Sequence, residues 1–162
     1  MDSLIYGILA YGAIMIILSL IILVVAIAAY ICRSLTLYRL FSAAYYPNAW
    51  MAWLPFCQQY AMGDMAASSS PDGCNVSYFN KINLPIPLCK FWFLICVLGC
   101  LPYIGWIIVL GAYVFFTLGN TTTMIANMHG TDPNSEVFPS LVAFLPFADA
   151  VYFNKVYKEI NG

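Results

Sequence analysis

The side chain with the most evident chemical potential is Asp149, an acid inside the apolar block 137–153. An ionisable group within a membrane span is costly to bury and is therefore a functional candidate. Pro146 precedes it by three residues, so a broken helix at this point could form a cation or proton site. Alternatively, Asp149 lies about two helical turns before Lys155 and is an acid solvated at the membrane edge.

Catalytic chemistry has little support in the residue types. His129 is the single histidine, and the sequence has no defensible nucleophile–His–acid spacing, no His-Glu-x-x-His, no phosphate-binding loop and no dinucleotide fingerprint. Cys96 and Cys100 lie four residues apart in an apolar stretch, where two packed small side chains are the simplest interpretation. We therefore expect no enzyme activity, no catalytic residue, no metal and no cofactor.

Polar side chains gather at the end of the second apolar block, at positions 120–123, 127 and 129. This pattern is typical of a helix end that emerges into the outer headgroups. Alternatively, the Thr and Asn side chains hydrogen-bond between helices or line a pore.

The composition predicts an integral membrane protein whose solvent is the lipid bilayer. Of the 162 residues, 63% are hydrophobic and 8% are charged, whereas soluble domains carry about 25% charged residues. Residues 4–31 contain no charge, and a helix needs roughly 20 apolar residues to cross the hydrocarbon. The net charge of −1 argues against nucleic acid as a partner.

We expect an all-α fold in one membrane domain, with spans at 4–31, 91–118 and 137–153. With these spans all six basic side chains fall on one side of the bilayer: Arg33, Arg39, Lys81, Lys90, Lys155 and Lys158. The positive-inside rule then predicts a multi-pass plasma-membrane protein with its N-terminus outside and its C-terminus in the cytoplasm. If the segment before Pro102 also crosses, everything after it is inverted.

The loop between the first two spans contains an aromatic segment that predicts an interfacial or re-entrant helix over 48–65. Trp50, Trp53, Phe56 and Tyr60 recur there at helical intervals, and Trp and Tyr favour the headgroup region. A polar cytoplasmic loop over 67–87 follows, since serines, Pro, Asp and Gly form turns.

A Leu-Pro-aromatic pattern occurs three times, with its prolines at Pro55, Pro102 and Pro146. The spacings of 47 and 44 residues favour an internal repeat. Each proline removes a backbone N–H and disturbs a helical carbonyl, so we expect a helix break or kink at each. The break either shapes packing or exposes backbone to a transport path.

Small residues recur every seven positions at Gly105, Ala112, Gly119 and Ala126. Membrane helices associate through such small side chains because close backbone approach replaces the missing hydrophobic drive. The stripe predicts a helix-packing seam, with the first span or another chain as its partner.

The segment 50–55, Trp-Met-Ala-Trp-Leu-Pro, leads to Tyr-Ala-Met-Gly at 60–63. It resembles small bacterial integral membrane proteins of unknown function that carry a Trp-Ala-Trp-Leu/Ile-Pro segment after the first span. The resemblance implies a bacterial plasma membrane and supplies no activity. Many of those proteins have an Asn shortly after this proline, where this chain has Phe56, Cys57 and Gln58.

Together these patterns predict a non-enzymatic membrane subunit or scaffold that associates through the small-residue seam with copies of itself or with another membrane subunit. The alternative is a homo-oligomeric channel or transporter that uses Pro-broken helices and Asp149.

Overall fold

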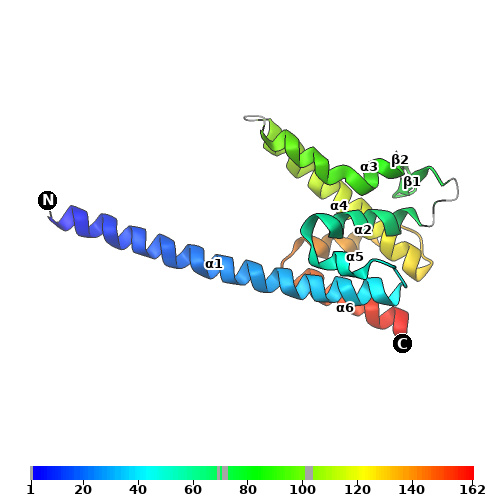
Figure 1. Ribbon diagram of the computed structural model, residues 1–162, viewed down its shortest axis with the longest axis horizontal. Helices are drawn as coiled ribbons and strands as arrows, with labels where there is room; N and C mark the ends of the chain where they lie inside the picture. Colours follow the sequence, from blue (N-terminus) through cyan, green and yellow to red (C-terminus); the bar gives the residue numbers. More distant parts are fainter. Residues whose placement is uncertain (1, 69, 71–72, 101–103) are drawn as a thin grey trace.

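The computed structural model describes residues 2–68, 70, 73–100 and 104–162 of the chain. They form a helical protein with one small β-hairpin, which confirms the helical class (Figure 1). In chain order the elements are α1 (Asp2–Ala43), η1 (Ala49–Trp53), α2 (Pro55–Ala67), β1 (Asn75–Tyr78), β2 (Ile82–Pro85), α3 (Ile86–Phe91), η2 (Trp92–Cys100), α4 (Gly105–His129), α5 (Val137–Ser140), η3 (Leu141–Phe144) and α6 (Ala148–Asn161), where η marks a 3-10 helix.

Helix α1 is a 42-residue rod, about 63 Å long, with two different environments along its length. Its N-terminal part projects alone from the rest of the chain (Figure 1), and residues 13–27 are all exposed. Its C-terminal part packs against η1 and α6. Within the described residues, the apolar stretch 13–27 of α1 is therefore uncovered, and the shorter C-terminal part from Arg33 onward joins a helical body.

Two helices are long and apolar enough to cross a membrane: α1, over Tyr11–Ala43, and α4, over Gly105–His129. The predicted set of three spans is not supported. The range 91–118 is divided between the end of α3, η2 and the first part of α4.

The predicted span at 137–153 is wrong as a single helix, because it is divided between α5, η3 and the start of α6. Leu145 is extended, with φ −93° and ψ 125°, as expected for a residue that precedes proline. The helix that follows is short and amphipathic, and buries one side that includes Phe153 and Val156.

The expected interfacial helix at 48–65 is two elements, η1 and α2, which meet at Leu54. Helix α2 is a core helix, since most residues from Gln58 to Ala66 are buried. The predicted loop at 67–87 contains the hairpin, in which Val76 pairs with Leu84 in an antiparallel register. Its turn uses Phe79 and Asn80, both with φ of 55°.

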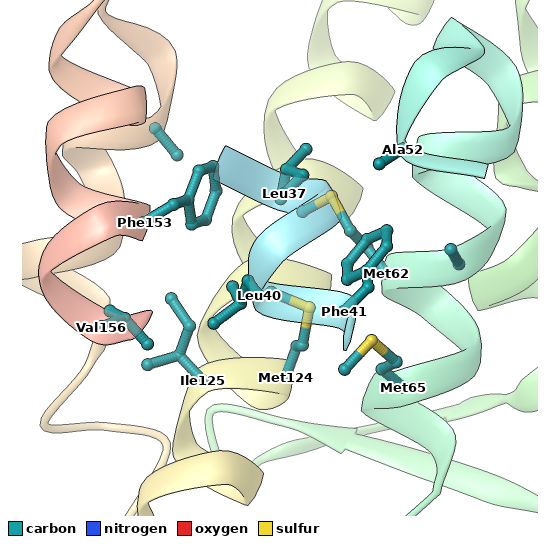
Figure 2. Packing of buried hydrophobic residues seen from close by; sticks show 12 residues of the cluster. Leu37, Leu40, Phe41, Ala52, Met62, Met65, Met124, Ile125, Phe153 and Val156 are labelled. Carbon is teal, nitrogen blue, oxygen red and sulfur yellow. The ribbon is translucent and has the colours of Figure 1, made fainter. Parts of the chain in front are cut away.

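The main core gathers one side of each long element of the body around the C-terminal part of α1 (Figure 2). Helix α1 lies between α6 and α2, with α4 behind it. The buried residues come from six elements, α1, η1, α2, α4, η3 and α6: Leu37, Leu40, Phe41, Ala52, Ala61, Met62, Met65, Met124, Ile125, Ala143, Phe153 and Val156. Burying one of the Leu, Ile, Val, Phe or Met side chains stabilises the fold by about 1.5–3 kcal/mol.

A second apolar cluster joins the β-hairpin to α3, η2 and α4. Trp92 and Phe116 stack with ring centroids 5.6 Å apart, and Tyr78 is fully buried beside them. This cluster holds η2 and the first part of α4 together as a second projection, which points away from the body (Figure 1).

Candidate functional site

Two of the three prolines of the repeat, Pro55 and Pro146, lie at junctions between a 3-10 helix and an α-helix. Pro55 is the first residue of α2 and follows η1, whereas Pro146 follows η3 and lies two residues before α6. The leucines before them have nearly the same conformation, with ψ of 125° at both Leu54 and Leu145. Proline fits a helix start because its missing N–H has no partner there in any case.

Pro102 lies outside the described residues. The elements on either side of it, η2 and α4, nevertheless follow the same order as at the other two prolines.

Each of the two described junctions has a carbonyl that accepts a hydrogen bond from a polar side chain. At the first, Gln58 Nε2 donates to the Ala52 oxygen over 2.5 Å. At the second, Arg33 Nη1 donates to the Ala143 oxygen over 3.3 Å. Both carbonyls lie three residues before the proline, where the helical bonding is interrupted.

Asp149 forms an ion pair with Arg33, and the pair is largely removed from solvent. The distance from Arg33 Nη1 to Asp149 Oδ2 is 3.2 Å, and the side chains are 13% and 6% exposed. Asp149 Oδ1 accepts the Ala150 N–H over 2.7 Å, and the guanidinium lies 6.0 Å from the centre of the Phe153 ring. The candidate acid is therefore paired and hydrogen-bonded on both oxygens.

Ser34, the neighbour of Arg33, bonds to the other junction. Gln58 Nε2 donates to Ser34 Oγ over 3.0 Å, and both residues are buried. Arg33, Ser34, Gln58 and Asp149 thus form a polar centre that ties both proline junctions to two successive residues of α1. It lies where the uncharged stretch of α1 ends and the body begins.

A cavity of about 320 Å³ adjoins the polar centre between α1, α2, η2 and α4. Its lining includes Arg33, Gln58 and Gln59 together with Trp92 and Tyr113. Gln59 Oε1 and Trp92 Nε1 are buried with no hydrogen-bond partner in the chain. Buried polar atoms of this kind are uncommon, since each costs about 1–3 kcal/mol when unpaired.

The small-residue stripe lies against other parts of the same chain. A side chain at Gly119 would overlap the ring of Tyr78. Ala112 packs against the Tyr78 cluster, and Gly105 and Ala126 are buried. At these positions the stripe residues therefore pack against other parts of the same chain.

The polar residues at the end of α4 are inside the body and not in an exposed helix end. Tyr78 Oη donates to Asn120 Oδ1, and Asn120 Nδ2 donates to the Cys89 oxygen over 3.1 Å. Asn127 Nδ2 donates to the last carbonyls of α2, those of Met65 and Ala66. Of the two alternatives that the sequence left open, the contacts of Asn120 and Asn127 match hydrogen bonds between elements. The buried hydroxyls of Thr121, Thr122 and Thr123 have no hydrogen-bond partner among the described residues.

His129 also binds within the body. Its Nδ1 lies 3.3 Å from Glu136 Oε1, and its Nε2 lies 3.6 Å from Glu159 Oε2. Within the part of the chain that the structure describes, no three His, Cys, Asp or Glu side chains gather as metal ligands.

The four aromatic residues of the predicted interfacial helix are divided by exposure. Trp50, Trp53 and Phe56 are 42–61% exposed, whereas Tyr60 is half-buried and contacts Phe91, with ring centroids 5.4 Å apart.

One charged cluster was missed from the sequence: Asp64, Lys90 and Tyr46. Lys90 Nζ lies 2.5 Å from Asp64 Oδ1, and Tyr46 Oη donates to Asp64 Oδ2 over 2.9 Å. Burial and the neighbouring carboxylate raise the pKa of Tyr46, so its hydroxyl stays protonated as a donor. No local signal joins these residues, because 18 and 26 positions separate Asp64 from its two partners.

Comparison with known proteins assigns no family, because no family model, curated protein or solved structure matches the chain.

Proposed function

We propose that this protein is a small non-enzymatic membrane subunit or scaffold, anchored in the bilayer by α1. The observation that carries the proposal is the uncovered apolar half of α1. Residues 13–27 are exposed and apolar except for Ser19, whose hydroxyl donates to the Ile16 carbonyl within the helix. A surface of this kind is stable only against lipid or other apolar helices.

The length of α1 fits this role. Its uncharged stretch at 4–31 comprises 28 residues, or about 42 Å of helix, against roughly 30 Å of hydrocarbon. Arg33 then lies just beyond the hydrocarbon, where the polar centre fixes α1 to the body.

The distribution of basic residues favours a cytoplasmic body. All six basic residues follow the exposed stretch of α1, and none lies between Trp92 and Asn120, which includes the second projection. By the positive-inside rule, the N-terminus is then outside and the C-terminus is cytoplasmic. We place the protein in a bacterial plasma membrane, as the resemblance of residues 50–55 implies.

Association in this proposal uses the exposed face of α1, because the small-residue stripe of α4 is already packed. The partner is a second copy or another membrane subunit. Apolar helices in lipid associate by close packing and not by exclusion of water, so a partner with a complementary surface is required.

A homo-oligomeric channel or transporter has less support. Asp149 is paired with Arg33, and Pro55 and Pro146 lie in the body and not within the uncharged stretch of α1. Neither of the two described proline junctions places free backbone in that stretch.

The test is the mass of the purified protein in native nanodiscs, combined with photo-crosslinking from α1. A photoreactive side chain at Ile17 or Ile21 should capture a protein partner, whereas one at the exposed Val151 of α6 serves as the matched control. The proposal expects a complex heavier than the 18.0 kDa chain and crosslinks from α1 alone. A single chain with no crosslink from either α1 position would contradict the subunit role.

A further inference from the structure

A cavity of about 700 Å³ lies in the body and is separate from the polar centre. Its lining includes residues at the C-terminal ends of four helices: Ala44 follows α1, Ala67 ends α2, and Met128 and Ile160 precede the last residues of α4 and α6. Small-molecule sites have volumes of about 300–1,000 Å³, so the cavity is large enough for a ligand.

The C-terminal ends of four helices contribute to the lining, which favours positive charge beside them. Each helix carries roughly half a negative charge at its C-terminus, because the carbonyl dipoles align along the axis. Asp64 adds a full negative charge at the wall, and its side chain is 30% exposed. Among the described lining residues, the one basic side chain is Lys90.

Lys90 places a positively charged group against Asp64 at the edge of the cavity. Its ammonium lies 2.5 Å from Asp64 Oδ1 and 5.8 Å from the centre of the Tyr60 ring. The carboxylate receives a further hydrogen bond from Tyr46 on its other oxygen. An ammonium held by a carboxylate and an aromatic ring is a common arrangement for cation recognition.

The rest of the lining combines polar residues, among them Ser68, Ser70 and Asn127, with apolar and adaptable side chains. Met65, Met124 and Met128 contribute thioether side chains, and Ile160 lies at the C-terminal end of α6. Methionine fills irregular space and accommodates ligands of different shape. The cavity thus combines an anionic wall with a partly apolar lining.

We propose that this cavity binds an organic cation, an amine or quaternary ammonium with a small apolar group, whose charge displaces Lys90 from Asp64. The apolar group lies among the methionines, and the cationic group faces Asp64 and Tyr46. An anionic ligand is disfavoured because it would face Asp64 and the four helix C-termini.

The test uses hexyltrimethylammonium as the probe, measured by titration calorimetry on the full chain in zwitterionic nanodiscs, with empty nanodiscs as the blank. We expect saturable binding that Asp64→Asn weakens by about tenfold or more. Lys90→Gln should tighten binding, because it removes the internal competitor. Asp132→Asn, which changes an exposed acid outside the cavity lining, should leave the affinity unchanged.

A fourth variant protects the test against misfolding of Asp64→Asn. Ser68 is exposed and lines the cavity, so Ser68→Trp should fill the space and abolish binding without disturbing the core. Wild-type binding no greater than the blank, or unchanged affinity in Ser68→Trp, would overturn the proposal. Preferential binding of hexyl sulfate that is lost in Lys90→Gln would also overturn it, in favour of an anion site.

Discussion

At the scale of single residues, Arg33 and Asp149 illustrate how a charge becomes tolerable beside an apolar helix. Either charge alone would be costly to bury, whereas the pair and its additional hydrogen bonds satisfy both groups. The pair also joins α6 to the point where the exposed stretch of α1 ends. We regard Asp149 as the anchor of α6.

Breaking this pair on one side should be strongly destabilising. Asp149→Asn leaves the guanidinium without its counter-charge, and we expect a loss of about 3–5 kcal/mol in the free energy of unfolding. Thermal or denaturant unfolding in mild detergent measures the loss. The double variant Arg33→Met/Asp149→Leu should recover much of it, and equal stability of wild type and Asp149→Asn would disprove the anchor role.

Gly119 tests the internal use of the small-residue stripe. Gly119→Ala should destabilise the fold by about 1–3 kcal/mol, because the added carbon overlaps the buried ring of Tyr78. Gly111→Ala is the matched control in the same helix, since nothing lies within 4 Å of its added carbon. If Gly119→Ala changed oligomer mass and left monomer stability intact, the stripe would instead be an interface between chains.

Sequence reasoning at this scale found single residues better than their partners. Asp149 was recognisable because an acid in an apolar block is unusual, but its partner Arg33 lies 116 positions away. The same limit hid the Asp64–Lys90 pair. Tertiary packing decides which charged side chains form such ion pairs, and a local sequence pattern does not predict it.

At the scale of elements, the repeated proline junction is the organising unit. Each described junction changes the chain direction between a short 3-10 helix and an α-helix, and each is bonded to α1 by a polar side chain. The two described proline junctions thus attach the body to the long helix α1 in similar ways.

The first junction can be tested through Gln58. Gln58→Leu removes the donor to Ser34 and to the Ala52 carbonyl, and we expect a loss of about 1–3 kcal/mol from two unsatisfied buried acceptors. Phe56→Leu, at an exposed position of the same helix, should change stability by less than about 0.5 kcal/mol. Equal effects of the two changes in denaturant unfolding would argue against a stabilising role of this junction.

Tyr152 of α6 donates its hydroxyl to Glu136 Oε2, just before α5, over 3.5 Å, and this contact should make stability depend on pH. Burial raises the pKa of Tyr152 to about 12, from about 10 in an unfolded chain. The folded state therefore keeps a proton that the unfolded state loses, and stability decreases as the pH rises from 10 to 12. Unfolding measured across this window should depend less on pH in Tyr152→Phe, and an unchanged slope would contradict the assignment.

The elements were predicted unevenly. The first helix was evident because 28 uncharged residues have few alternatives. Two of the three repeated prolines, Pro55 and Pro146, lie at junctions between a 3-10 helix and an α-helix. The single span predicted at 137–153 was wrong because apolar content alone does not distinguish a membrane span from short helices that pack on a core. The core position of α2 was equally hidden, since its aromatic residues suggested an interface.

At the scale of the whole molecule, the chain combines a compact helical body with two apolar projections. The body has its own core around α1, and it holds the organic-cation cavity, whereas the outer half of α1 remains uncovered. This division explains the composition: the hydrophobic excess lies where lipid or a partner would cover it. The central claim is that α1 crosses the bilayer and leaves the body in the cytoplasm.

The most direct test is vectorial cysteine labelling with a membrane-impermeant maleimide. In a variant without other cysteines, one cysteine is placed in a short tag ahead of Met1 or kept at Cys74, which is exposed in the body. If α1 crosses the bilayer, the tag is labelled only in right-side-out vesicles and Cys74 only in inside-out vesicles. Labelling of both positions from the same side would show that α1 does not cross the membrane.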